Sequence, residues 1–122
     1  MAVGKRILVV DDTAFMRFKL KAILEKGGHV VVGEATNGQE GVEKCALLRP
    51  DLVTLDVNMP DMDGLAALKL MKEQCPEVAV VMITAMGRQE IVMDAMMAGA
   101  SDFIVKPFED EKVARAIAQL TS

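Results

Sequence analysis

The sequence predicts an α/β fold in which helices cover both faces of a parallel sheet. Short apolar runs alternate with longer stretches of helical periodicity, as in repeated strand–helix–strand units. The runs are continuously apolar, which is typical of strands that are buried on both sides. Hydrophobic residues make up 52% of the 122 residues. This composition and length suit one domain, predicted over residues 1–122, with one core.

Five apolar runs are the predicted strands. They lie near residues 6–10, 30–35, 52–55, 79–83 and 103–105. The second run, VVVGEA, is interrupted by Gly33 and Glu34. We therefore expect this strand at an edge of the sheet.

Capping residues and helix breakers delimit five helices between and after the strands. Thr13 can cap the first helix, and Asn37 can cap the second, with Glu40 in the capping-box position. The helix-ending residues are Gly27-Gly28, Pro50, Pro76 and Gly99. The apolar positions of the last helix, expected to face the sheet, are Val113, Ile117 and Leu120.

Composition excludes several function classes. The formal net charge of −4 argues against a nucleic-acid-binding surface, which needs a basic patch. No apolar stretch can span a membrane, and the N-terminus does not resemble a secretory signal, so we expect a cytoplasmic protein. Cys45 and Cys75 lack CxxC spacing and are interpreted as buried thiols in a reducing compartment. The single histidine, His29, has no Cys or His nearby in the sequence, so we expect no zinc site.

Polar residues close four of the apolar runs. Asp11 and Asp12 follow the first, Asp56 follows the third, Thr84 follows the fourth and Lys106 follows the fifth. In a parallel sheet these positions meet at the carboxyl edge, where open α/β sheets bind ligands. Three carboxylates, a hydroxyl and an ammonium group gathered there suit a divalent metal and a phosphoryl group.

The roles of these residues follow from their chemistry. Neighbouring carboxylates repel, and Mg²⁺, which prefers oxygen ligands, relieves that repulsion. Asp56 stands singly at the end of the central strand and is the candidate nucleophile for an aspartyl phosphate, while the Asp11-Asp12 doublet suits metal binding. Lys106 and Thr84 can contact phosphoryl oxygens, as phosphoryl transfer needs mainly positioning and charge neutralisation.

Other readings fit less well. Strand-end residues such as Asp12 or Thr84 can merely cap the following helix, but this explains the whole set poorly. No GxxxxGK[ST] or GxGxxG pattern is present, which argues against a P-loop or dinucleotide site. An EF-hand loop starting at Asp56 would need glycine at 61 and an acid at 67, where the chain has Asp61 and Ala67.

The motifs LVVDD, LDVNMPDMDG, MITA and GASDFIVKPF closely resemble those of the receiver domains of two-component response regulators, in particular the CheY-like chemotaxis type. The resemblance extends over essentially the whole chain. It implies a flavodoxin-like doubly wound sheet of five strands in the order 2-1-3-4-5. It also implies that the protein is a signalling switch, not an enzyme with an external substrate, and that it assists its own phosphorylation and dephosphorylation.

The resemblance further implies a role for each site residue. Asp56 accepts the phosphoryl group from a histidine kinase, and Thr84 and Lys106 contact its oxygens. The implied Mg²⁺ ligands are Asp11 (through water), Asp12, Asp56 and Asn58 (backbone carbonyl). Asn58 and Met86 occupy positions that tune the phosphoryl lifetime, and Lys106-Pro107 is expected to be cis.

The family switches by a movement of Thr84 towards the phosphoryl group, which lets the aromatic residue at 103 turn inward. Here that residue is Phe103, without the hydroxyl of the tyrosine found in many chemotaxis members. Ala85 is small enough to leave room for the phosphoryl group. The implied partners are a CheA-like kinase and a target such as a flagellar motor switch protein, and neither nucleic acid nor a membrane.

The fourth predicted helix should carry a partner surface. The residues expected on its buried face are Val92, Ala95, Met96 and Gly99. Met93 and Met97 then lie on the outward face, where flexible methionines suit partner contacts. In this family the fourth helix, fifth strand and fifth helix bind partners or dimerise.

Two other functions stay open from the sequence. The chain could be the receiver of a larger regulator, such as a chemotaxis methylesterase or a transcription factor, whose output would lie outside these residues. It could also be a metal-dependent phosphotransferase acting on small molecules, although we find no spare residues for a cap domain.

Overall fold

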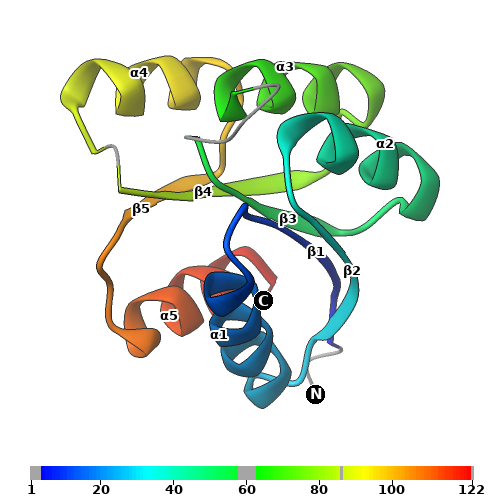
Figure 1. Ribbon diagram of the computed structural model, residues 1–122, viewed down its shortest axis with the longest axis vertical. Helices are drawn as coiled ribbons and strands as arrows, with labels where there is room; N and C mark the ends of the chain where they lie inside the picture. Colours follow the sequence, from blue (N-terminus) through cyan, green and yellow to red (C-terminus); the bar gives the residue numbers. More distant parts are fainter. Residues whose placement is uncertain (1–3, 58–62, 86, 122) are drawn as a thin grey trace.

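The computed structural model describes residues 4–57, 63–85 and 87–121. A five-stranded parallel sheet lies between two layers of helices, with α1 and α5 on one face and α2, α3 and α4 on the other (Figure 1). The strand order is β2-β1-β3-β4-β5, which confirms the predicted fold and topology.

The strands lie within one residue of their predicted positions. They are β1 (Arg6–Val10), β2 (Val30–Ala35), β3 (Leu52–Leu55), β4 (Ala79–Thr84) and β5 (Asp102–Val105). The strand with the glycine and the glutamate, β2, is at an edge as predicted. Its pairing with β1 shifts between Ile7 and Leu8, just where Gly33 enters the ladder.

Five helices follow the strands. They are α1 (Ala14–Lys26), α2 (Gly38–Leu48), α3 (Gly64–Gln74), α4 (Gln89–Met97) and α5 (Asp110–Thr121). Thr13 and Asn37 cap α1 and α2 as predicted, through bonds from the backbone N–H groups of Met16 and Glu40. The Glu40 carboxylate accepts from the backbone N–H of Thr36 at 2.7 Å. In a standard capping box it would accept from the N–H of the cap residue itself, Asn37.

The core consists of two apolar layers, one on each face of the sheet. Alternate residues of each strand enter opposite layers: Ile7 and Val9 pack towards α1 and α5, whereas Leu8 and Val10 pack towards α2, α3 and α4. Cys45 and Cys75 are buried and free, as expected. Within the described part of the chain, every helix is too short or too polar to cross a lipid bilayer.

The predicted buried face of α4 is wrong in part. Ala95 is buried, but Met96 is 44% exposed and Gly99 is exposed. The helix packs instead through Ile91, Ala95 and Ala98, whose i, i+4, i+7 spacing turns the buried face away from Met96. Met93 and Met97 are exposed, as predicted.

The last turn of α5 gives a second correction. Val113 and Ile117 are buried against the sheet as expected, but Leu120 is 37% exposed. Leu120 lies in the final turn of the helix, beyond its last buried residue, Ile117.

Candidate functional site

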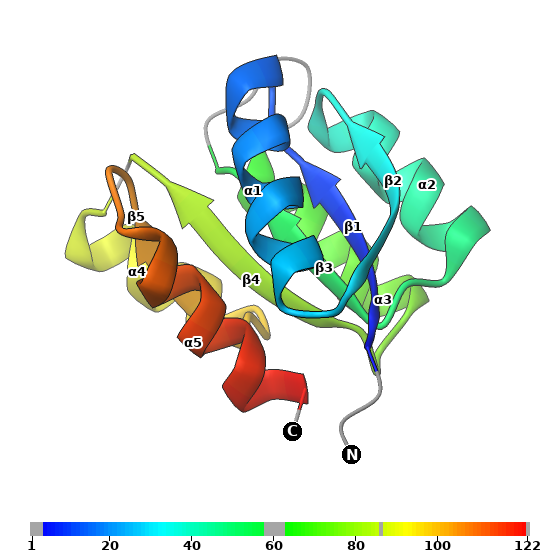
Figure 2. The same ribbon diagram turned by 90° about the horizontal axis from the view of Figure 1, so that it is seen from below.

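The parallel register brings the predicted site residues to one edge of the sheet. Leu55 of β3 pairs with Val10 of β1 and with Met82 of β4, so the residues that follow these strands emerge side by side. Figure 2 shows the arrowheads of β1 and β4 ending on the same side of the sheet. The buried polar side chains there are Asp11, Asp56 and Thr84, while Asp12 is exposed.

Lys106 joins two of the carboxylates. Its Nζ lies 2.8 Å from Asp11 Oδ2 and 3.1 Å from Asp56 Oδ2, across 95 and 50 residues of sequence. Burial alone would lower the pKa of Lys106, but hydrogen bonding and charge from Asp11, and then from Asp56, raise the pKa above its usual value. Lys106 is therefore a firmly protonated cation inside the cluster.

Three carboxylates converge at this point. Oxygens of Asp11, Asp12 and Asp56 lie within 4.8 Å of one another, and they form the one such group among the described residues. Three negative charges and the one positive charge of Lys106 leave a formal charge of −2, which a divalent cation would balance. The oxygen-only donor set and the exposed Asp12, which leaves room for water, fit Mg²⁺, which keeps several waters and takes few carboxylates.

Asp11 is held by contacts on both its backbone and its side chain. Its N–H donates to the carbonyl of Ala35 at 3.0 Å. Its Oδ1 accepts from the backbone N–H of Thr13 at 2.9 Å and from the Thr13 hydroxyl at 3.0 Å. Thr13 thus caps α1 and orients a site carboxylate, a second role that the sequence reading missed.

The backbone beside Asp56 is packed against the start of α3. The N–H of Gly64 donates to the carbonyl of Val57 at 2.8 Å, and a Cβ at position 64 would overlap the carbonyl oxygen of Asp56. Only glycine allows this close approach, so the chain can return directly to the site after the loop. The predicted backbone ligand, Asn58, lies outside the described residues.

The predicted switch residues lie on β4 and β5. Thr84 is buried at the end of β4, and its carbonyl accepts from the N–H of Lys106 at 2.8 Å. Phe103 is partly buried and packs against the layer that contains Met82, its partner in the β4–β5 pairing. The Lys106-Pro107 bond is cis, as the resemblance implied, whereas Met86 is outside the described residues.

A family model decides the identity of this fold and cluster. The model of the response regulator receiver domain matches residues 7–118. The chain belongs to the receiver domain family. Receiver domains are components of two-component systems that work with histidine kinases and bind Mg²⁺ at an acidic site, which is the kind of site formed here by the three aspartates.

Named relatives of this receiver domain point to the chemotaxis type. The chain is 51% identical to the chemotaxis protein CheY of Thermotoga maritima over 114 residues, or 93% of this chain and 95% of that protein. It is 54% identical to the CheY of Bacillus subtilis over 112 residues, or 92% and 93% of the two chains. A crystal structure of the CheX-CheY-BeF3-Mg²⁺ complex from Borrelia burgdorferi matches with a TM-score of 0.93 and 34% identity, covering 98% and 91% of the chains.

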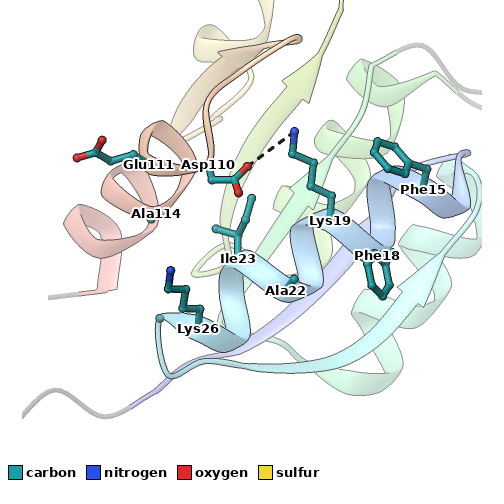
Figure 3. A pocket seen from close by; sticks show the side chains of 10 residues that line it. Phe15, Phe18, Lys19, Ala22, Ile23, Lys26, Asp110, Glu111 and Ala114 are labelled. Carbon is teal, nitrogen blue, oxygen red and sulfur yellow. Dashed lines mark ion pairs between the residues drawn. The ribbon is translucent and has the colours of Figure 1, made fainter.

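A separate groove of about 660 Å³ lies between α1 and α5 (Figure 3). Phe15 and Phe18 are exposed along it, and Lys19 spans it to reach Asp110 at 3.7 Å. The groove shares no lining residue with the acidic cluster. The acidic cluster therefore lies outside this groove.

Proposed function

We propose that this receiver domain is a phosphorylation-activated signalling switch whose phosphoryl acceptor is Asp56. The observation that carries the proposal is the placement of Asp56 within 3.1 Å of Lys106 Nζ and within 4.8 Å of the oxygens of two further aspartates. A carboxylate in such a setting can act as a nucleophile while cations neutralise the phosphoryl charge.

The phosphoryl group would come from a phosphohistidine of a CheA-like kinase. An Asp56 oxygen attacks phosphorus, the P–N bond to the imidazole breaks, and a P–O bond to Asp56 forms. Lys106, held protonated by its two carboxylate partners, would pair with the phosphoryl oxygens and hold them in position. Mg²⁺ held by Asp11, Asp12 and Asp56 would supply the remaining charge neutralisation.

The signal would leave through the surface formed by α4, β5 and α5. The backbone N–H of Lys106 bonds to the carbonyl of Thr84, and Phe103 lies two residues before the end of β5. A shift of the Thr84 hydroxyl towards a phosphoryl group could therefore change the conformation of β5 and of the surface around it. Because Phe103 has no hydroxyl, partner recognition would rest on apolar contacts. The exposed Met93 and Met97 of α4 offer such contacts.

The similarity to CheY proteins supports a role in chemotaxis, with a target such as a flagellar motor switch protein. The same relatives support action inside the cell. Residues 1–122 would form one receiver domain.

Intact-mass spectrometry after incubation with acetyl phosphate tests the proposal. We expect one phosphoryl adduct that requires Mg²⁺, is stable in acid and is labile in base. A protein that takes up no adduct with Mg²⁺, from acetyl phosphate or from a purified chemotaxis kinase, would contradict it. Steady turnover of acetyl phosphate without an adduct would favour the rival function, a small-molecule phosphotransferase.

A further inference from the structure

Arg17 connects the edge strand to the acidic cluster. Its Nη1 donates to the backbone carbonyl of Asp11 at 2.8 Å, and its Nε donates to Glu34 Oε1 at 3.2 Å. The Arg17 side chain is only 17% exposed, so the guanidinium is largely shielded from water. A planar guanidinium can serve two acceptors in fixed directions, which a lysine ammonium group cannot do as well.

The acceptor on Asp11 is the important point of contact. The carbonyl of Asp11 belongs to the same planar peptide unit as the N–H and Cα of Asp12. Fixing this oxygen therefore fixes the position of the Asp12 Cα and the N–Cα axis about which the Asp12 side chain can rotate. Asp12 is exposed, so packing does little to hold it, and its carboxylate must still meet those of Asp11 and Asp56.

We propose that Arg17 is a positioning residue for the metal site, and that it acts by locking the Asp11–Asp12 peptide against Glu34. The inference rests on the proposed function in assuming that the three aspartates bind Mg²⁺. Arg17 touches neither the metal nor the phosphoryl group in this account. Its effect passes entirely through the Asp11 carbonyl.

Glu34 is the second residue of this positioning arrangement. It holds the guanidinium in place and offsets its positive charge, which would otherwise repel a cation bound nearby. The Glu34 carbonyl in turn accepts from Lys44 Nζ of α2 at 2.5 Å, so this point of β2 is held from both helical layers. The glutamate that marked β2 as an edge strand therefore has a specific role at the site.

The test compares Mg²⁺ affinity in Arg17→Met with that in a matched control, Arg115→Met. Arg115 pairs with Glu111 at 3.3 Å on α5, where the two side chains are 68% and 78% exposed. Mg²⁺ binding is measured by calorimetric titration, and circular dichroism confirms that each variant folds. We expect Arg17→Met to raise the Mg²⁺ Kd about 10-fold, as loss of a group that orients a metal ligand does, and Arg115→Met to leave it unchanged.

Further variants separate positioning from a general structural role. Glu34→Gln and Arg17→Lys should raise the Kd less than Arg17→Met, and the Arg17→Met/Glu34→Gln double variant should be no worse than Arg17→Met alone, because Glu34 acts through Arg17. The rate of phosphorylation by acetyl phosphate should recover in Arg17→Met when Mg²⁺ is raised to saturation. If Arg17→Met fails to fold, Glu34→Gln and Arg17→Lys carry the same comparison.

A Kd for folded Arg17→Met that stays within about twofold of the unaltered protein would overturn the inference and leave the proposed function standing. If Arg17→Met does not fold, the same result for both Arg17→Lys and Glu34→Gln would overturn it. Tighter Mg²⁺ binding would also overturn it, because Arg17 would then act only as a like charge. If the unaltered protein binds no Mg²⁺, the metal dependence in the proposed function fails, and the inference fails with it.

Discussion

The two edges of the sheet carry similar polar residues but use them differently. At the amino edge, side chains bond to nearby backbone: Asp51 Oδ2 accepts from the N–H of Arg6 at 2.9 Å, and His29 Nδ1 accepts from the N–H of Lys5 at 3.0 Å. At the carboxyl edge, Asp11 and Asp56 instead converge on Lys106, with Asp12 close by.

The difference shows which feature identifies the site. Polar residues at strand ends occur at both edges, and a hollow of about 520 Å³ lies at the amino edge, beside Asp51 and Cys75. Among the residues that the structure describes, three carboxylates converge only at the carboxyl edge. Convergence of like charges is costly for stability alone, so it indicates a site for a cation.

The largest expected effect is the loss of phosphorylation in Asp56→Asn. An amide oxygen is a poor nucleophile towards phosphorus, so no adduct should form with acetyl phosphate. The matched variant at the other edge, Asp51→Asn, should be phosphorylated normally. Intact-mass spectrometry checks both proteins, and full single-site labelling of Asp56→Asn would show that the acceptor has been chosen wrongly.

Lys106→Ala should preserve the fold but separate phosphorylation from switching. Without the ammonium group, the phosphoryl oxygens lose the contact that links them to β5. Amide NMR shifts that beryllofluoride induces in α4 and β5 should therefore be largely lost. The control is Lys112→Ala, an exposed lysine of α5. Unchanged shifts in Lys106→Ala would count against this role.

Mg²⁺ should stabilise the native protein measurably. A ligand present at about 100 times its Kd adds about 2.7 kcal/mol to the free energy of unfolding. We expect this gain in urea unfolding of the unaltered protein and of Asp51→Asn, and its removal by EDTA. Asp12→Asn should show a much smaller gain, and an undiminished gain there would remove Asp12 from the metal site.

The amino edge should contribute stability only. Asp51→Ala removes an acceptor of the Arg6 N–H and should lower the free energy of unfolding by about 1 kcal/mol. Mg²⁺ affinity and phosphorylation should not change. Urea unfolding and a Mg²⁺ titration measure the two quantities, and a weakened Mg²⁺ affinity would break the distinction between the edges.

Alkaline pH gives the smallest effect. The native pKa of Lys106 is raised above its unfolded value of about 10.4, so its contribution to stability is complete below that pH and is lost as pH rises through the native pKa. In urea unfolding with EDTA present, the unaltered protein should lose more free energy of unfolding than Lys106→Ala does as the pH rises through this range. The Cys45 thiol, whose pKa is raised to about 12 by burial and by neighbouring Cys75, contributes in the same range but is common to both proteins. If the difference in free energy of unfolding between the unaltered protein and Lys106→Ala did not change with pH, the ion pairs of Lys106 would be contradicted.

Much of this arrangement could be predicted, because it depends on order along the chain. The parallel sheet follows from the alternating runs, and the strand order follows from the family resemblance. The meeting of Asp11, Asp56 and Lys106 follows from parallel strands that end at one edge. Cap residues such as Thr13 act within three positions and are equally visible in the sequence.

The unpredicted features depend on contacts between distant segments or on exact rotation. Arg17 and Glu34 meet only because α1 crosses the edge strand, and Cys45 and Cys75, 30 positions apart by number, prove to be neighbours in the core. Met96 is exposed because α4 packs on the core through Ile91 and Ala98, which are partly buried, and through Ala95. No local pattern specifies these details.

Amide NMR with stepwise addition of Mg²⁺ and then beryllofluoride tests the contrast between the edges most directly. We predict that Mg²⁺ shifts the amides of residues 11–13 and 56–57, and that beryllofluoride extends the shifts to Thr84, Lys106 and α4. The amides around Asp51 should stay unchanged throughout. Shifts centred on Asp51, or none at the carboxyl edge, would contradict the account.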